Sequence, residues 1–322
     1  MNERLKKITP ERKRFTIHKL QTIKTNKITW IDIKGPTSSD LENLKTDFDL
    51  HPLVLKEILP QIDYPKIENY GDYLFIVFFY PFFDKETSST LPFELDIIVG
   101  KNFLITNHYR DIVPLSALFH DCNLYPEKME QFCDEGTGEL LYRIINEILN
   151  ACFPKISHIK KNIDEIDKII FRKENKKAIN QISLVKRDII GFERILEPQK
   201  LVLQNLIKES ELYFPKKMLP YFHNLLNSYE QVKNLLETNE KTLLSLENTN
   251  QSLIDTKTNE IMKTLTLFSV IVFPLTLLAA LFGMNTKILP LVGLPYDFWI
   301  VSGIMVAGAF TMVAFFKSKK WF

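Results

Sequence analysis

The chain has 322 residues and a formal net charge of +2, from 41 lysines and arginines against 39 aspartates and glutamates. Because this charge is nearly balanced, it does not favour a nucleic-acid surface, and no nucleic-acid partner is expected. Apolar residues are unevenly placed: roughly the first 260 residues have a soluble composition and roughly the last 60 a membrane composition. The polar, Lys- and Arg-rich opening predicts no cleaved signal peptide and a cytosolic N-terminal domain.

Residues 1–130 are predicted to form a cytosolic α/β domain. Aromatic and β-branched runs of strand length lie at 28–33, 73–79, 93–99 and 102–106. Ser38, Ser39 and Asp40 open a run that predicts a capped helix over 38–48, and a second, short helix is expected over 51–59. The scattered Cys122, Cys133 and Cys152 lack metal-site or redox spacing, so we expect free, reduced thiols.

Residues 131–215 are predicted to form an antiparallel helical pair. Its two amphipathic helices are expected over 136–172 and 174–211, and Pro198 interrupts the second. Between Pro220 and Pro274 the chain has no proline or glycine and is rich in helix formers. A continuous helix of about 60 residues is therefore expected, and its part over 216–264 is a stalk before the membrane.

Two apolar segments near the C-terminus have the length of membrane spans. The first is uncharged over 265–282 and is assigned as transmembrane helix 1 over 265–285; the second covers 298–316. Residues 286–297 form the loop between them, and residues 317–322 form a basic tail that contains Lys317, Lys319 and Lys320. The positive-inside bias predicts both termini in the cytosol, the loop outside, and a cell (inner or plasma) membrane location.

A row of mostly small or polar residues follows one face of the predicted long helix, at steps of four and three residues, and we call it the polar stripe. Its cytosolic members are Asn248, Ser252 and Asp255; those toward and within the membrane are Asn259, Met262, Thr266, Ser269, Phe273, Thr276 and Ala280, with Leu265 beside them. A polar face in lipid is costly unless it faces water or other helices. Two helices cannot enclose an aqueous path, so the polar stripe is interpreted either as a pore lining supplied by several copies or as an inert oligomer seam. Met262 and Phe273 are either gating constrictions or packing residues.

The first span ends in Phe282-Gly283-Met284-Asn285. Asn285 places an amide, both donor and acceptor, where the helix leaves the hydrocarbon. Gly283 allows backbones from several copies to approach closely. The segment Gly283-Met284-Asn285 therefore predicts an ion-selectivity site, with Asn285 in the pore lining.

Enzyme chemistry is not indicated by the sequence. It contains no phosphate-binding glycine loop, Ser-His-Asp pattern or zinc-spaced histidine pair, so we expect no catalytic residue and no organic cofactor. Acidic residues gather at Asp84 and Glu86 and at Asp164 and Asp167. These are interpreted as solvated surface or, alternatively, as regulatory ligands through which neighbouring subunits share a divalent cation.

Several segments together resemble the CorA family of divalent-cation transporters, over nearly the whole chain. They are Asn259-Glu260-Ile261-Met262-Lys263, Leu265-Thr266, Phe273-Pro274-Leu275-Thr276, Phe282-Gly283-Met284-Asn285, Trp30-Ile31-Asp32, His51-Pro52-Leu53, Pro65-Lys66-Ile67-Glu68, Tyr73-Leu74-Phe75 and Lys101-Asn102-Phe103-Leu104-Ile105-Thr106. The basic tail is similar to the one in that family. A Gly-Met-Asn between two spans at the chain's end, with these flanks, is highly specific.

The resemblance implies a funnel-shaped homopentamer, built from the α/β cytosolic domain, the long helical stalk and two transmembrane helices. It implies pore-lining roles for Asn259, Met262, Leu265, Phe273 and Thr276, and the outer selectivity ring for Asn285. It also implies uptake of Mg²⁺, with Co²⁺ or Ni²⁺ as further candidates, down the electrochemical gradient, and closure by intracellular Mg²⁺. The expected partners are further copies of the chain, membrane lipids and divalent cations.

Three departures from the family pattern bear on the ion. The loop after the motif reads Thr286-Lys287-Ile288-Leu289-Pro290, where many members carry acidic Met-Pro-Glu-Leu. Asn224 and Asn227 replace carboxylates that hold regulatory Mg²⁺, and Asn248 replaces a pore aspartate for which Asp255 compensates. Two alternatives therefore stay open: a ZntB-like proton-coupled Zn²⁺ transporter, and a non-conducting, membrane-anchored oligomeric scaffold.

Overall fold

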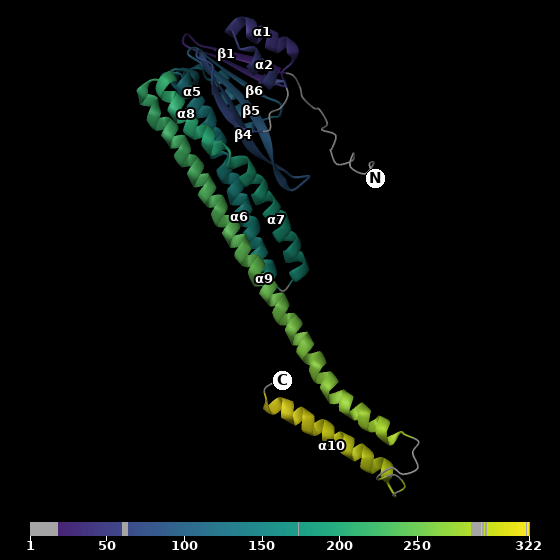
Figure 1. Ribbon diagram of the computed structural model, residues 1–322. Coiled ribbons are helices and arrows are strands. Elements are labelled where there is room, and N and C mark those ends of the chain that lie inside the picture. The colour runs from purple at the N-terminus through teal and green to yellow at the C-terminus, as the bar shows by residue number, and fades with distance from the viewer. Residues whose placement is uncertain are drawn as a thin grey trace. The chain divides into compact units, whose positions relative to one another are not determined.

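The computed structural model describes residues 19–59, 64–172, 174–284, 291, 293, 295–319 and 321. The chain divides into two compact units, Met1–Glu247 and Asn248–Phe322. Figure 1 shows the ribbon, in which one long helix, α9 (Leu219–Phe282), belongs to both units.

The strands described in the first unit form one six-stranded sheet with the order β1-β2-β6-β5-β4-β3. They are β1 (Lys19–Lys24), β2 (Thr29–Lys34), β3 (Lys66–Asn69), β4 (Tyr73–Asp84), β5 (Ser89–Gly100) and β6 (Phe103–His108). β2 pairs with β6 in parallel, and the other neighbours are antiparallel. The predicted strands are confirmed as β2, β4, β5 and β6. The sequence missed β1 and β3, the two edge strands, which have few buried positions and so no apolar run.

Eight α-helices precede α9 in the described part of the chain, with a short 3₁₀ turn (Lys216–Met218) just before it. They are α1 (Ser38–Phe48), α2 (Pro52–Ile58), α3 (Val113–Leu124), α4 (Pro126–Phe132), α5 (Thr137–Asn150), α6 (Cys152–Phe171), α7 (Asn175–Leu196) and α8 (Gln199–Tyr213). The two predicted short helices are confirmed as α1 and α2. The cap of α1 is Thr37, one residue before the predicted position, in a capping box with Asp40.

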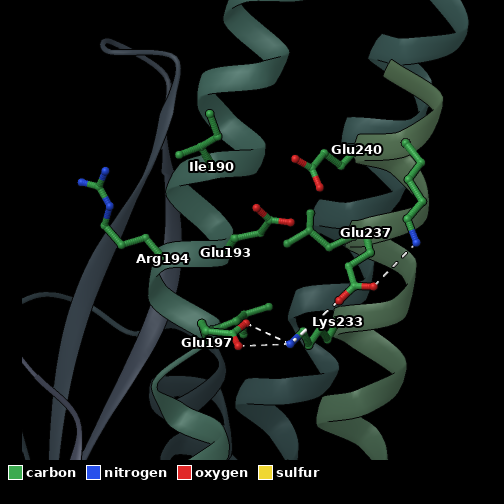
Figure 2. A pocket seen from close by; sticks show the side chains of 10 residues that line it. Ile190, Glu193, Arg194, Glu197, Lys233, Glu237 and Glu240 are labelled. Carbon is green, nitrogen blue, oxygen red and sulfur yellow. Dashed lines mark hydrogen bonds and ion pairs between the residues drawn. The ribbon is translucent and has the colours of Figure 1, made fainter. Parts of the chain in front are cut away.

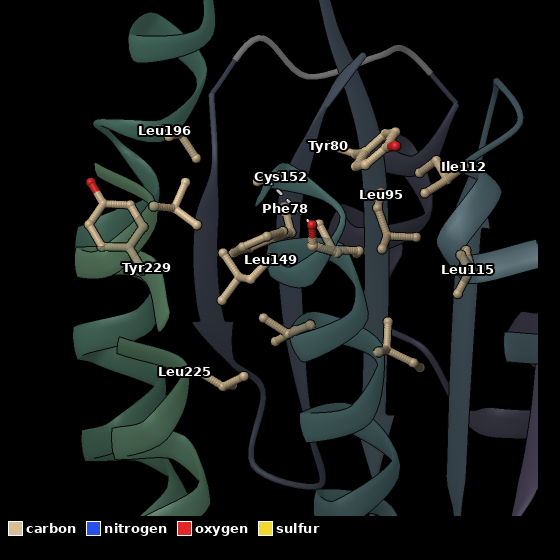
Figure 3. Packing of buried hydrophobic residues seen from close by; sticks show 14 of the residues in the cluster. Phe78, Tyr80, Leu95, Ile112, Leu115, Leu149, Cys152, Leu196, Leu225 and Tyr229 are labelled. Carbon is tan, nitrogen blue, oxygen red and sulfur yellow. Dashed lines mark hydrogen bonds between the residues drawn. The ribbon is translucent and has the colours of Figure 1, made fainter. Parts of the chain in front are cut away.

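Both faces of the sheet are covered, and this explains why β4 is apolar without alternation. Phe75 and Val77 pack in a core with α1 and α2. Leu74, Ile76 and Phe78 point to the other face, into a larger core with α3 to α9. Figure 3 shows this larger core, in which residues of β4 and β5 meet residues of α5 and of the first turns of α9.

The two predicted helices over 136–172 and 174–211 are four helices in the structure. The first prediction breaks at Ala151, between α5 and α6. Pro154 is the reason, because it has no N–H to donate to the carbonyl of Asn150. The second breaks at Pro198, as expected, between α7 and α8. Helices α6 and α7 lie side by side (Figure 1). α6 buries a stripe of isoleucines, and α7 buries isoleucine and valine side chains.

The long helix is confirmed: α9 is continuous over 64 residues, or roughly 96 Å at 1.5 Å per residue. The two candidate membrane spans are the apolar C-terminal part of α9, which ends at Phe282, and α10 (Asp297–Ser318). Their most apolar windows have mean hydropathies of 2.4 and 2.0. Only 6% of the first window and none of the second is buried inside the structure. The predicted loop over 286–297 falls almost wholly outside the described residues.

Cys122, Cys133 and Cys152 are free and buried, in agreement with the prediction of free thiols. Burial raises the pKa of Cys122 to about 11 and that of Cys152 to about 12. All three belong to the larger core, so they act as small packing residues rather than as nucleophiles.

Candidate ion pathway

The polar stripe lies along α9 and is exposed from end to end in the single chain. At about 100° per residue, its members from Asn248 to Ala280 fall within a strip roughly 120° wide, with Leu265 at the edge. Even its bulky apolar members are uncovered: the exposed fraction is 55% for Met262, 56% for Leu265 and 79% for Phe273. The residues that the structure describes therefore leave this face free.

The hydroxyl groups of the polar stripe donate to their own helix. Thr266 Oγ1 lies 2.8 Å from the Met262 carbonyl, Ser269 Oγ 2.9 Å from that of Leu265, and Thr276 Oγ1 2.9 Å from that of Val272. Each hydroxyl thereby places its proton in the helix and keeps oxygen lone pairs on the exposed side. The membrane part of the stripe thus offers uncharged oxygen acceptors.

A carboxylate lies in the cytosolic part of the polar stripe. Asp255 is exposed, and its Oδ1 accepts a hydrogen bond from Gln251 Nε2 at 2.9 Å. Because this partner is a neutral amide, the charge of Asp255 is not cancelled by it. Asn248, which stands two stripe steps further back, accepts at its main-chain carbonyl from Ser252 Oγ at 3.0 Å.

Pro274 interrupts the hydrogen-bond pattern of the apolar segment without ending the helix. It removes the N–H that would bind the carbonyl of Val270. Packed neighbouring helices or Thr side chains can satisfy a carbonyl that is freed in this way. The threonine of the following turn does not fill this role, because Thr276 donates to Val272 instead.

The Gly-Met-Asn motif is only partly described. Gly283 N donates to the Ala279 carbonyl at 3.0 Å, and Met284 N to that of Leu281 at 3.4 Å. A Cβ on Gly283 would lie 3.2 Å from the Ala279 oxygen, so glycine relieves crowding at the last turn. Met284 is 52% exposed. Asn285 lies outside the described residues, so its selectivity role stays a prediction.

The regulatory candidates do not converge within one chain. Asp84 lies at the end of β4, where it accepts from Thr87 Oγ1 at 2.8 Å and from Glu86 N at 3.1 Å, and the Thr87 bond is the main cause of its lowered pKa. Asp164 and Asp167 lie on α6. Among the described residues, no group of three or more His, Cys, Asp or Glu could hold a metal ion. A site shared between subunits stays a prediction.

The remaining predicted residues lie at the surface. Asn224 accepts a hydrogen bond from the Tyr142 hydroxyl at 3.2 Å, and Asn227 is exposed. Of the basic tail, Lys317 and Lys319 are exposed, whereas Lys320 lies outside the described residues.

Sequence reasoning missed an acidic pocket of about 460 Å³ between α7 and α9 (Figure 2). Glu193 and Glu240 point toward one another across it, while Lys233 binds Glu197 at 2.9 Å. Burial, together with the nearby glutamates, raises the pKa of Glu193. Only the fold reveals the pocket, because its carboxylates lie far apart in the sequence, between positions 193 and 240.

A buried acid in β5 was also missed. Asp96 is 1% exposed, and its Oδ2 accepts from Asn107 Nδ2, on β6, at 2.8 Å. Burial raises its pKa well above the usual range, and the neighbouring Glu94 carboxyl adds to the rise. Two acids on one face of an otherwise apolar strand were the available signal.

Comparison with known proteins agrees with this architecture. A family model described as CorA-like Mg2+ transporter protein matches residues 25–319. The cobalt/magnesium transport protein CorA of Thermotoga maritima is 27% identical over 298 residues, covering 91% of this chain and 83% of that protein. The structure of the complete CorA magnesium transporter from Methanocaldococcus jannaschii matches with a TM-score of 0.80 at 23% identity, covering 93% of each chain.

A weaker likeness links the chain to the ZntB cytoplasmic domain from Vibrio parahaemolyticus, with a TM-score of 0.54 at 11% identity over 72% of this chain and 90% of that one. This match concerns the fold alone. The family model, by contrast, spans the sheet from β2 onward, the long helix and both candidate spans. The chain belongs to the CorA-like Mg²⁺ transporter family and is a membrane transport protein.

Proposed function

We propose that the chain assembles into a homopentamer that admits Mg²⁺, with Co²⁺ or Ni²⁺ as further cargo, into the cytosol down the electrochemical gradient. The polar stripe of α9 lines the path, and Asn285 forms its outer selectivity ring. The observation that carries the proposal is the uninterrupted exposure of this stripe from Asn248 to Ala280, on a helix that passes from a soluble unit into a membrane-length apolar segment.

Assembly from several copies is supported by what one chain leaves uncovered. Phe273 is 79% exposed in the middle of an apolar segment, on the same face as the hydroxyls of Ser269 and Thr276. One face that is both polar and apolar suits neither lipid nor water alone. If each copy packs this face around a common axis, the hydroxyls line a water-filled path, and the apolar side chains form a narrow part of that path.

The chemistry of the stripe suits a hydrated divalent ion. Mg²⁺ gives up its waters reluctantly, so hydroxyl and amide oxygens can bind those waters rather than the ion. Asp255 adds negative charge on the cytosolic side. The membrane potential supplies about 2.3 kcal/mol per charge per 100 mV, so inward flow of a divalent ion requires no nucleotide.

Met262, Leu265 and Phe273 are the proposed gate. Rings of apolar side chains exclude water when they approach, and this stops ion flow. Intracellular Mg²⁺ would close the gate by binding between cytosolic domains. Because Asn224 and Asn227 are amides, the carboxylates for this binding are sought instead at Asp84, Glu86, Asp164 and Asp167.

Both termini are placed in the cytosol in this proposal, in the cell membrane. The support comes from charge: Lys263 precedes the first span, and Lys317 and Lys319 end the second.

Replacing Asn285 by Ala tests the selectivity ring directly. We expect the Asn285→Ala variant to lose Mg²⁺ influx into proteoliposomes, while Asn234→Ala, which removes the same amide from the cytosolic part of α9, keeps it. Normal selective uptake by Asn285→Ala would contradict the assignment. No flux by the unaltered protein would favour the non-conducting scaffold.

Zinc transport is the competing function, favoured by the missing acids in the loop after the motif. Influx of Mg²⁺ and Zn²⁺ is compared with and without a pH gradient. Our proposal predicts Mg²⁺ influx that is independent of the gradient. Zn²⁺ influx that requires the gradient, with little Mg²⁺ influx, would assign the alternative.

A further inference from the structure

A groove of about 530 Å³ lies on α9, at the cytosolic start of its apolar segment and wholly within the second unit. Its lining residues are Glu260, Lys263, Thr264, Leu267, Phe268, Ile271 and Trp321. Leu267, Phe268 and Ile271 make an apolar floor, and Lys263 stands at the end where the charged residues begin. The groove is therefore apolar along its floor and positively charged at the end where Lys263 lies.

The groove lies on the side of α9 that faces away from the polar stripe. At about 100° per residue, its members from Glu260 to Ile271 centre roughly 160° from the centre of the stripe. If the stripe faces the axis of an assembly, this side faces outward. In the membrane-length part of α9 an outward face meets lipid rather than water.

Trp321 returns to the groove from the end of α10. Its ring stacks on Phe316 with centroids 5.6 Å apart, and its main-chain N–H donates to the Phe316 carbonyl at 3.0 Å. Phe316 and Leu267 are the buried apolar side chains described in the second unit, at 9% and 5% exposure. Trp321 lines the groove together with Lys263, and Lys317 and Lys319 precede Trp321 by four and two residues in the chain.

The charge at this end is mainly positive. Lys263, Lys317 and Lys319 are exposed, and within the described part of the chain no carboxylate forms an ion pair with any of them. Glu260 is the one acid among the lining residues. Three cations against one anion at a membrane surface attract negatively charged headgroups.

We propose that this groove binds an anionic phospholipid from the cytosolic leaflet. Its phosphate lies between Lys263 and the lysines of the tail, and one acyl chain follows the floor from Leu267 to Ile271. Trp321 covers the junction of headgroup and chain, where tryptophan is favoured. The proposal rests on the topology proposed above, which puts both lysine-bearing ends in one leaflet, but not on which ion is conducted.

An anionic lipid fits the groove better than a soluble anion does. From Lys263 to Ile271 the groove follows eight residues, or about 12 Å of helix, and apart from Thr264 its lining beyond Lys263 is apolar. A free phosphate would use only the mouth. A zwitterionic lipid would fill the floor equally well but would gain less from the lysines.

The test is native mass spectrometry of the full-length assembly in detergent, titrated with phosphatidylglycerol or phosphatidylcholine of identical chains. We expect tighter binding of phosphatidylglycerol, and about fivefold weaker binding in Lys263→Gln, since a lysine near a membrane surface contributes about one such factor. Lys241→Gln removes the same charge about 33 Å away on α9 and should bind like the unaltered protein. Equal binding of the two lipids, or no difference between the two variants, would overturn the proposal.

A second variant tests the apolar floor at constant charge. Thr264→Trp fills the groove with an indole and should displace phosphatidylglycerol, although all three lysines remain. Unchanged binding would place the lipid elsewhere. Inorganic phosphate that displaces the lipid as effectively as a second anionic lipid would assign the lysines to a free anion and would also overturn the proposal.

Lipid binding and ion flux are separate readouts. If the assembly binds phosphatidylglycerol selectively but conducts no Mg²⁺, the proposed function fails and the groove stands. If it conducts Mg²⁺ but shows no lipid preference, the proposed function stands and the groove fails.

Discussion

Helix α9 behaves differently in the two units through which it passes. In the first unit Phe222 and Tyr229 are 1% and 0% exposed, because they lie in the core with the sheet and α5. In the second, Met262 and Phe273 on the same helix are 55% and 79% exposed. The first unit thus buries these side chains of α9 within the single chain, whereas the second leaves apolar side chains of the same helix exposed.

Polar groups differ in the same way. The first unit buries them in specific pairs, such as Thr90 Oγ1 on Asp188 at 2.6 Å and Asn107 on Asp96. In the second unit the hydroxyls of Thr266 and Ser269 bond only to carbonyls of their own helix. Polar side chains therefore specify packing in the first unit, whereas the hydroxyl oxygens of Thr266 and Ser269 in the second remain exposed.

The largest expected effect comes from one pair of phenylalanines on α9. Phe222→Ala should lower the free energy of unfolding by about 3–5 kcal/mol, because it empties a packed core position. Phe273→Ala should change it by less than about 0.5 kcal/mol, since this side chain is exposed, but should raise Mg²⁺ flux by widening the proposed gate. Thermal unfolding in detergent and proteoliposome flux measure the two effects. A similar loss of stability in both variants would break the contrast between the units.

A second prediction uses the buried carboxyl of Asp96. Its raised pKa means that the folded state binds the proton more tightly than the unfolded state. The free energy of unfolding therefore falls as pH rises from about 4 through the folded-state pKa. Asp96→Asn removes this titration and should lose less stability as pH rises from about 4, by about 1.4 kcal/mol for each pH unit up to the folded-state pKa. Melting temperatures that change in parallel for both proteins would contradict the prediction.

Adding one methyl group, by a Gly→Ala change in each unit, compares how tightly the two units are packed. A Cβ on Gly191 of α7 would lie 2.9 Å from the Thr90 carbonyl oxygen of β5, so Gly191→Ala should cost about 1–3 kcal/mol. A Cβ on Gly303 of α10 would meet nothing within 4 Å in the single chain, so Gly303→Ala should be neutral or gain up to about 1 kcal/mol. Loss of the assembly in Gly303→Ala, followed by size-exclusion chromatography, would instead show that a neighbouring copy packs there.

The smallest expected effect concerns two threonines two positions apart on α9. Thr266 lies in the polar stripe and Thr264 outside it, and both hydroxyls donate to their own helix, at 2.8 and 2.9 Å. Neither Val variant should change the melting temperature much. Thr266→Val should lower Mg²⁺ flux about two- to tenfold, the equivalent of one hydrogen bond, and Thr264→Val should not. Equal flux in the two variants would remove the hydroxyls from the conduction path.

Where the sequence carried a long periodic signal, it predicted the structure well. The absence of proline and glycine between Pro220 and Pro274 predicted α9, and the polar stripe was readable because helical spacing alone places its members on one face. The apolar runs of β4 and β5 predicted central strands, since both sides of the sheet are buried.

Where the signal depends on tertiary contacts, the prediction failed. The edge strands β1 and β3 are defined by pairing rather than by burial. The break at Ala151 is a different kind of failure, because its cause, Pro154, is a local signal that was overlooked within the amphipathic pattern. Two cavities also bring together residues from distant parts of the sequence: the pocket of Glu193 and Glu240, and the groove under Trp321. No local spacing in the sequence predicts either of them.

The central claim is that the polar stripe lines the ion path, and reaction of neighbouring engineered cysteines tests it most directly. Thr276→Cys lies in the stripe, and Leu275→Cys points roughly 150° away from its centre. The native cysteines are buried and can remain. A membrane-impermeant, cationic thiol reagent should block Mg²⁺ flux through the Thr276→Cys variant and leave Leu275→Cys unaffected. Block of both variants alike, or of Leu275→Cys alone, would contradict the account.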